Sequence, residues 1–167
     1  MDHSCKIVTK HPLSENHLTQ NSSMLDISPL KDTEYEAWQP LAQAYLAFYR
    51  STRPPEDYHL LWQRLMAKEP LHSLGARLNG QLVGLAHYLF HASAWGADVC
   101  YLQDLYVDPA HRRQGVARCL IEGVSHHARW VHAPRVYWLT QAGNTVARQL
   151  YDQVATHSGF IRYEMNL

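Results

Sequence analysis

The stretch that decides the fold covers residues 104–117 and reads Asp104-Leu105-Tyr106-Val107-Asp108-Pro109-Ala110-His111-Arg112-Arg113-Gln114-Gly115-Val116-Ala117. The apolar alternation that ends at Val107 predicts the end of a buried strand, and Asp108-Pro109 predicts a turn behind it. A helix is expected to begin at Gly115. The sequence therefore predicts a strand, a tight turn and a helix in direct succession.

The turn before this helix has the features of an anion-binding site. The first N–H groups of a helix lack partners within it and lie at the positive end of its dipole. The small residues Gly115 and Ala117 let the backbone approach an anion closely, while Arg112 and Arg113 add charge and fork-shaped donors. We interpret the turn as a cradle for a pyrophosphate.

The common nucleotide-binding motifs do not account for this turn. The patterns Gly-x-x-x-x-Gly-Lys-(Ser or Thr) and Gly-x-Gly-x-x-Gly are both absent, which disfavours ATP and NAD. One alternative is that Arg112 and Arg113 form a solvated surface at an ordinary helix start. Nucleic-acid binding is disfavoured, because neither a helix-turn-helix nor an interleaved aromatic platform accompanies the arginines.

Length and composition limit the class of protein. The chain has 167 residues, of which 46% are hydrophobic and 18% charged, and its 15 Lys and Arg balance its 15 Asp and Glu. These values predict one globular domain and exclude a disordered chain or a polybasic protein that wraps nucleic acid. Positive charge is nevertheless concentrated locally, because five arginines and one acid, Glu122, stand between Pro109 and Arg135.

Cysteine and histidine usage bears on compartment and metals. Three cysteines without a Cys-x-x-Cys pair argue against a disulfide framework or a thiolate zinc site, so a cytoplasmic location is expected. No stretch approaches the ~20 apolar residues of a membrane span, and no export signal is recognisable. Among the 12 histidines no His-Glu-x-x-His occurs, and His87 and His91 lack a clear third ligand, so no metal is expected.

Working outward from residues 104–117, the hydrophobic periodicity predicts one α/β domain over residues 24–167, preceded by a flexible extension over residues 1–23. Asn79-Gly80 between two alternating runs is a strong hairpin signal. The expected strands cover about residues 25–30, 76–78, 82–88, 99–107, 136–140 and 160–165, and the expected helices about 33–49, 60–66, 115–131 and 144–154.

These motifs resemble those of the GCN5-related N-acetyltransferase (GNAT) superfamily. Residues 112–117 match its acyl-CoA signature, (Gln or Arg)-x-x-Gly-x-(Gly or Ala), and the likeness covers roughly residues 25–167. The chain is most similar to the fungal branch of histone/polyamine and D-amino-acid acetyltransferases and its bacterial relatives. That closer likeness rests on residues 38–49, 104–108 and 136–140, and on Asn144 followed by Leu150-Tyr151.

The resemblance implies a fold and an activity. The fold would be a single domain with a mixed, mostly antiparallel sheet of 6–7 strands, about four flanking helices and a V-shaped splay between the central strands. The activity would be transfer of the acetyl group of acetyl-CoA to a primary amine by direct attack in a ternary complex. The cofactor-binding residues would be Leu105, Tyr106, Val107, Arg112, Arg113, Gln114, Gly115, Val116, Ala117, Arg118 and Asn144.

The resemblance also implies the catalytic groups. Tyr151, two helical turns after Asn144, would protonate the departing CoA thiolate, although from its spacing alone it reads as a core aromatic. Some relatives carry a glutamate base where this chain has Gln103 followed by Asp104. We prefer Asp104 as the base. His87 and a water chain are alternatives, as is a purely structural carboxylate at Asp104.

Substrate-binding residues are expected on the first two helices, their connecting loop and the loop after residue 92. We expect Tyr49, Glu56, Asp57 and Trp95 to bind a cationic amine through charge and cation–π contacts. Arg50 and Arg53 flank the same loop and could instead bind a carboxylate, which would favour an amino acid.

Three further expectations concern partners. The acceptor is expected to be a small amine, a polyamine or an amino acid, with a protein lysine or N-terminus as the alternative. A non-catalytic CoA-binding module is a competing hypothesis. A homodimer is expected, because residues 160–163 could extend a sheet or exchange between subunits. No nucleic acid or membrane is expected as a partner.

Overall fold

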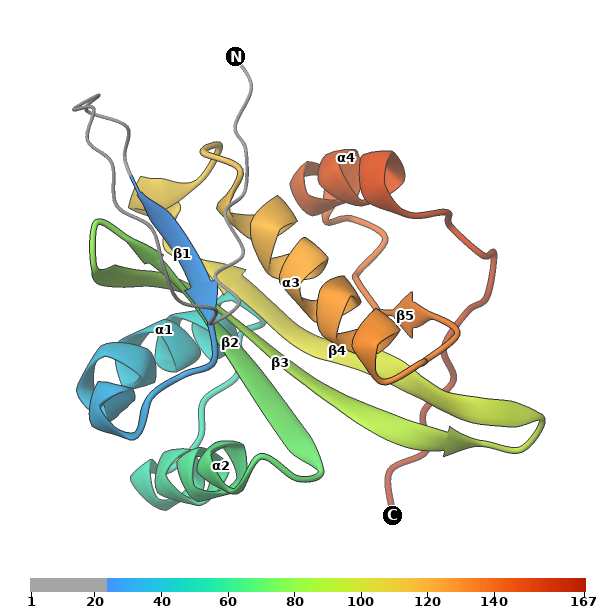
Figure 1. Ribbon diagram of the computed structural model, residues 1–167, viewed down its shortest axis with the longest axis horizontal. Helices are drawn as coiled ribbons and strands as arrows, with labels where there is room; N and C mark the ends of the chain where they lie inside the picture. The colour runs from blue at the N-terminus through green and yellow to red at the C-terminus, as the bar shows by residue number, and fades with distance from the viewer. Residues whose placement is uncertain (1–23) are drawn as a thin grey trace, which may run out of the picture.

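The computed structural model describes residues 24–167, and the extension predicted over residues 1–23 lies outside this range. The described chain forms one sheet of five strands in the order β1-β2-β3-β4-β5 (Figure 1). Neighbours from β1 to β4 run antiparallel, whereas β4 and β5 run parallel. The strands are β1 (Leu25–Ser28), β2 (Leu71–Leu78), β3 (Gln81–Ser93), β4 (Gly96–Val107) and β5 (Val136–Tyr137).

Four α-helices cover the sheet, as the sequence predicts. Helices α1 (Tyr35–Phe48) and α2 (Pro55–Ala67) lie on one face, and α3 (Val116–Trp130) and α4 (Thr145–Val154) lie on the other (Figure 1). Two short 3-10 helices, η1 (Asp32–Glu34) and η2 (Pro109–His111), precede α1 and α3. Each face of the sheet buries its own apolar cluster. The cluster beneath α1 includes Trp38 and Leu85, and the cluster on the other face includes Leu120 and Val124 of α3. The predicted α/β fold, a mixed sheet flanked by helices, is confirmed.

The hairpin predicted at Asn79-Gly80 joins β2 to β3. Both residues have positive φ, 51° and 86° respectively, which suits the right-handed twist of a tight hairpin. The register set by this turn places Leu78 opposite Gln81.

The strand count is lower than the predicted 6–7. Within residues 24–167 the structure has five strands, and the closing strand expected at residues 160–165 does not form. Alternating apolar residues suggested a strand there, but Phe160, Tyr163 and Met165 are 88%, 87% and 83% exposed. With neither a ladder partner nor a covered face, the segment has no interaction that would hold it extended in the sheet.

The last strand is also shorter than expected, and this shapes the molecule. The prediction was residues 136–140, but β5 pairs with β4 only at Val136 and Tyr137, opposite Cys100 and Tyr101. The chain then leaves the sheet, so the rest of β4, up to Val107, is paired with β3 but not with β5. The expected splay is therefore present, between β4 and the segment that follows β5.

Candidate active site

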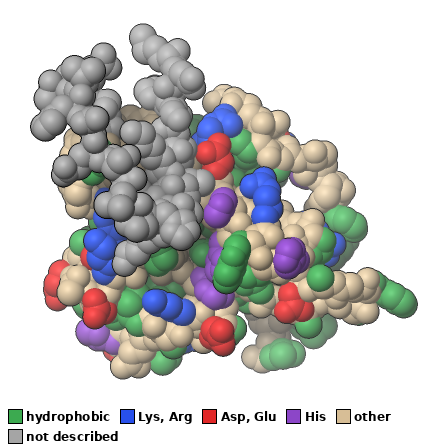
Figure 2. Space-filling view, viewed as in Figure 1, with side chains coloured by type: hydrophobic (Ala, Val, Ile, Leu, Met, Phe, Trp, Pro, Cys, Tyr) green, Lys and Arg blue, Asp and Glu red, His purple; other side chains and the backbone are tan. Residues whose placement is uncertain are grey.

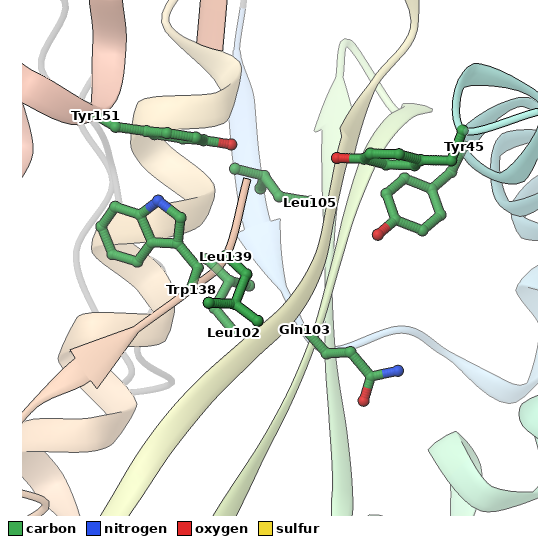
Figure 3. A pocket seen from close by; sticks show the side chains of 8 residues that line it. Tyr45, Leu102, Gln103, Leu105, Trp138, Leu139 and Tyr151 are labelled. Carbon is green, nitrogen blue, oxygen red and sulfur yellow. The ribbon is translucent and has the colours of Figure 1, made fainter. Parts of the chain in front are cut away.

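A small cleft opens at this splay. It holds about 280 Å³, including the part open to solvent. Side chains from both faces of the sheet reach it, because α1 and α4 approach β4 from opposite sides (Figure 3). The lining residues are Tyr45, Tyr49, Leu102, Gln103, Leu105, Trp138, Leu139 and Tyr151.

Tyr151 brings a proton donor to the cleft. It lies in the second turn of α4, and its ring packs edge-on against Trp138 with the centroids 5.3 Å apart. Its hydroxyl points past Leu105 toward the tyrosine side chains on the opposite wall of the cleft (Figure 3). Burial, with a smaller contribution from the charge of Tyr49, raises the pKa of Tyr151 to about 12. The phenol is therefore fully protonated at neutral pH and can act as an acid.

The turn from β4 to α3 has the backbone of an anion cradle. Gly115 is the N-cap of α3 with φ 80°, and Arg113 two residues earlier has φ 60°. Left-handed residues in such a turn direct successive N–H groups toward one point, and the helix N-terminus adds its dipole. A Cβ placed on Gly115 would meet no atom within 4 Å, so the space over the turn is open. This open, donor-lined turn fits a pyrophosphate.

The arginines of the turn play different parts. The Arg112 Nε donates to the carbonyl oxygen of Val107 at 3.0 Å, and its guanidinium lies 5.7 Å from the centre of the Tyr106 ring. Arg118 donates to the Gln153 side-chain oxygen at 2.6 Å and so ties α3 to α4. Arg113 is exposed. Arg112 thus fixes the turn to the end of β4, Arg118 joins α3 to α4, and Arg113 extends into solvent.

The edge of β4 offers backbone groups to the splay. The Asp108 N–H donates to the carbonyl oxygen of Val83 on β3 at 2.9 Å. The peptide groups of successive residues alternate in direction along a strand, so every second residue of β4 faces β3. The peptide groups of Leu105 and Val107 therefore face away from β3, into the gap that β5 leaves. A pantetheine arm needs such a row of backbone donors and acceptors, so the predicted segment fits it.

Two of the predicted cofactor-binding residues offer no side chain to the splay, and the peptide groups of Tyr106 also face β3 rather than the gap. The side chains of Tyr106 and Val116 are buried in the core, on opposite faces of the sheet. Asn144 is the N-cap of α4 rather than its first residue, and its side-chain amide donates to the Thr140 hydroxyl at 3.2 Å. The structure gathers the remaining residues at one end of the splay: Leu105, Val107, Arg112, Arg113, Gln114, Gly115, Ala117 and Arg118.

Asp104 does not line the cleft directly. The β3–β4 register pairs His87 with Asp104 and Tyr88 with Leu102, so Gln103 forms a β-bulge. The bulge reverses the alternation of β4 and turns Asp104 to the face that carries α1. There its Oδ2 lies 2.9 Å from Nδ1 of His87. Burial first, and the negative charge of Asp104 second, raise the pKa of both Tyr45 and Tyr49, so the carboxylate lies just behind these cleft tyrosines.

The predicted substrate residues are dispersed. Tyr49 lines the cleft. Glu56 and Asp57 occupy the first turn of α2, where Asp57 lies 3.9 Å from Arg53. Trp95 is 98% exposed in the turn between β3 and β4, at the end of that hairpin away from the splay (Figure 1). The structure brings only Tyr49 of these four to the cleft lining.

Sequence reasoning assigned no site role to the lining residues Trp138 and Gln103, and for Tyr45 it preferred core packing over a substrate contact. Helical spacing placed Tyr45 in the core, and Trp138 was expected in a strand. Because Tyr45 and Tyr49 are four residues apart on one helix, their rings meet at 5.2 Å. That spacing was the available signal for a shared face.

Other features of the surface bear on partners. On the face shown in Figure 2, basic side chains are scattered among acidic ones, in keeping with the overall charge balance. Over residues 24–167 no group of three His, Cys, Asp or Glu is placed to hold a metal ion. None of the helices in that range is both long and apolar enough to cross a membrane.

Comparisons with known proteins agree with this geometry. The model of the Acetyltransferase (GNAT) family matches residues 38–155. The D-amino-acid N-acetyltransferase HPA3 of Saccharomyces cerevisiae is 34% identical over 146 residues, which cover 84% of this chain and 89% of that protein. The uncharacterized N-acetyltransferase YhfO of Bacillus subtilis is 25% identical over 146 residues, which cover 86% of this chain and 98% of that protein. The structure of the aminoglycoside N-acetyltransferase AAC(6')-Iy in complex with CoA has the same fold, with a TM-score of 0.78 and 20% sequence identity. The superposition covers 89% of this chain and 99% of that protein.

Proposed function

Since the chain belongs to the Acetyltransferase (GNAT) family, it is an N-acetyltransferase, and we propose that its acceptor is the primary amine of a small molecule that attacks acetyl-CoA directly in a ternary complex. One observation carries this proposal: the Tyr151 hydroxyl points into the splay beside Leu105, whose backbone faces the same gap (Figure 3). Acetyl-CoA, when bound, supplies the thioester carbonyl that the amine attacks.

The residues that would hold the cofactor lie along one line. The turn at residues 112–117 would bind the pyrophosphate through its N–H groups and Arg113, and the free edge of β4 would bind the pantetheine arm. Asn144 would contact the arm from the N-terminus of α4. This path ends beside Tyr151.

Tyr151 would donate its phenolic proton to the departing thiolate. A pKa of about 12 makes the phenol a weak acid, so the thiolate must be comparably basic. Burial produces that match, because it raises thiol pKa values as it raises those of phenols. Cys100, buried at the base of the splay, shows the effect in this chain, since burial raises its pKa to about 12.

The amine would enter from the side of α1. Tyr45 and Tyr49 form this wall, and Asp104 behind them supplies the negative charge that attracts an ammonium group and can take up its proton. Arg50, exposed directly after Tyr49, is placed to attract a carboxylate at the cleft mouth. A small amino acid has both groups, and the name of the yeast relative supports this class over a polyamine or a protein lysine.

An acceptor screen tests the proposal. Release of free CoA thiol from acetyl-CoA would be measured over D- and L-amino acids, polyamines, aminoglycosides and basic peptides. We expect turnover with amino acids, and we expect Tyr151→Phe to lower kcat by about 100- to 10,000-fold. Tyr163→Phe, at a tyrosine 87% exposed, is the matched control and should retain activity. CoA binding without turnover on any amine would refute the proposal in favour of a binding module.

Two properties of the whole molecule belong to the same proposal. A homodimer is supported by the exposed apolar side chains of the C-terminal segment, and sedimentation of the full chain would test it. We also propose a cytoplasmic location, because the sequence has three cysteines and no Cys-x-x-Cys pair. The exposed apolar side chains are Phe160, Ile161, Tyr163, Met165 and Leu167.

A further inference from the structure

A chain of three side chains runs from the core beneath α1 to the back of the cleft. Trp38 of α1 is 0% exposed and His87 of β3 is 2% exposed. The indole Nε1 of Trp38 donates to Nε2 of His87 at 3.0 Å, and Nδ1 of His87 lies 2.9 Å from Oδ2 of Asp104. Both imidazole nitrogens are therefore occupied, one by a side chain of α1 and the other by a side chain of β4.

The proton on this imidazole has one possible place. An indole N–H can only donate, so Nε2 of His87 must be the unprotonated acceptor. The remaining proton then sits on Nδ1, which donates to Asp104. A second proton on Nε2 would bring two donors face to face at 3.0 Å in a site closed to water, which carries a large desolvation cost.

We infer that Trp38 and His87 are positioning residues, which hold Asp104 as an oriented anion by locking His87 in the neutral tautomer protonated at Nδ1. His87 occupies Oδ2 and leaves Oδ1 of the same carboxylate for the acceptor amine and the tyrosines in front of it. This inference rests on the proposed function only in what the carboxylate is for. The tautomer itself follows from the hydrogen bonds.

The surroundings of the chain are consistent with a single negative charge. The groups that face the carboxylate are Tyr45 and Tyr49 of α1 and Tyr101 of β4, and its charge contributes to the raised pKa of all three. Ser73 of β2 is the register partner of His87. All of these groups are neutral at pH 7. If His87 became an imidazolium it would pair with Asp104 and cancel the charge offered to an ammonium group. The Trp38 donor prevents this.

The geometry also removes one candidate base. His87 was an alternative to Asp104, but it has no free nitrogen with which to accept a proton from an amine. Its part is to orient the carboxylate, which is why the polar His87 and the indole N–H occur inside an otherwise apolar cluster.

The first test reads the tautomer without any activity. In the full chain labelled with ¹⁵N-histidine, we expect the His87 signals of a neutral ring with Nδ1 protonated and Nε2 accepting a hydrogen bond. Trp38→Phe removes the donor but keeps an aromatic ring, and should move the Nε2 signal of His87. Trp62→Phe is the matched control, because Trp62 packs on Trp38 at 5.0 Å but is not the donor to His87. A ring protonated at Nε2, or an Nε2 signal that is the same in both variants, would overturn the inference.

The second test reads the carboxylate through kcat/KM. With an acceptor from the screen, the acid limb of the pH profile should move up by about 1 pH unit in Trp38→Phe and stay in place in Trp62→Phe. His87→Asn keeps an N–H at the position of Nδ1 and should retain several-fold more activity than His87→Gln, whose amide reaches the position of Nε2. Equal loss in both histidine variants would contradict the positioning role. Absence of turnover in every variant would refute the proposed function, while the NMR result still decides the tautomer.

Discussion

Substitution of Gly115 by alanine separates the strain of the cradle from its contact with the cofactor. Gly115 has φ 80°, where a side chain is strained, but the open space around it means that an added methyl group meets nothing. Conformation alone should therefore lower the free energy of unfolding by about 1–2 kcal/mol. For a chain of this length that corresponds to a fall in Tm of about 2–4 °C per kcal/mol.

The cofactor should reveal a second and larger effect. A phosphate seated on the turn would occupy the open space that the methyl group enters, and hydrogen bonds to a charged group are worth about 1.5–3 kcal/mol each. Loss of one such bond should raise the Kd for CoA by about 10- to 100-fold, since each 1.4 kcal/mol is a factor of ten. Calorimetric titration of the folded variant with CoA measures this directly.

Gly80 provides the matched control for this experiment. It has φ 86° and the same open surroundings, but it lies in the turn between β2 and β3 rather than at the start of α3. Gly80→Ala should lower Tm by a similar amount and leave the Kd for CoA unchanged. If both variants weaken CoA binding equally, the loss comes from the fold as a whole and the cradle assignment is refuted.

Three further predictions concern stability and pH. Arg77 is buried between Glu34 and Asp26, so Arg77→Leu should lower the free energy of unfolding by about 3–5 kcal/mol. Arg162→Leu, at an exposed ion pair, should lower it by less than about 1 kcal/mol, and thermal melts of the two variants compare these effects. Burial opposes ionisation of Glu34, but the hydrogen bond from Arg77 outweighs it and lowers the pKa of Glu34. The ionised Glu34 should thus contribute its full share of stability above the ordinary pKa near 4.5, and this contribution should vanish as the pH falls through the lower pKa of the folded state. In thermal melts recorded from pH 6 to 3, Glu34→Gln should therefore show a weaker dependence of Tm on pH. Because the pKa of Tyr151 is raised to about 12, no fall in kcat assignable to this acid should occur below about pH 10; a fall near pH 8 that Tyr151→Phe abolishes would contradict this role.

The parts of the fold that could be predicted depend on neighbours in sequence. The Asn79-Gly80 hairpin follows from two residues that tolerate positive φ, and the start of α3 follows from Gly115 and the apolar face behind it. The cradle was predictable for the same reason, since its donors are backbone groups of one short turn. The role of Tyr151 was instead implied by the family resemblance, and one helix fixes its position relative to Asn144.

The parts that could not be predicted depend on which strands find partners. Residues 160–165 and the end of the predicted strand 136–140 have strand-like sequences, yet a strand is stable only when a neighbour completes its ladder. The orientation of Asp104 depends on the bulge at Gln103, which exists only because β3 and β4 pair in one register. The alternation of strand residues correctly predicted that Asp104 and Gln103 lie on different faces of the sheet. It could not predict that Asp104 lies against His87.

The sequence by itself therefore determined the α/β class and predicted the phosphate-binding turn, because these arise from periodicity or from a few adjacent residues, whereas the acid role of Tyr151 was implied by the family resemblance. Only the tertiary structure decided that Trp38, His87 and Asp104 form one hydrogen-bonded chain, because these residues come from three elements separated by 49 and 17 positions. Hydrogen bonds between such distant residues require the complete packing of α1 on β3 and β4. The proposed entry of the amine from the side of α1 depends on the same packing.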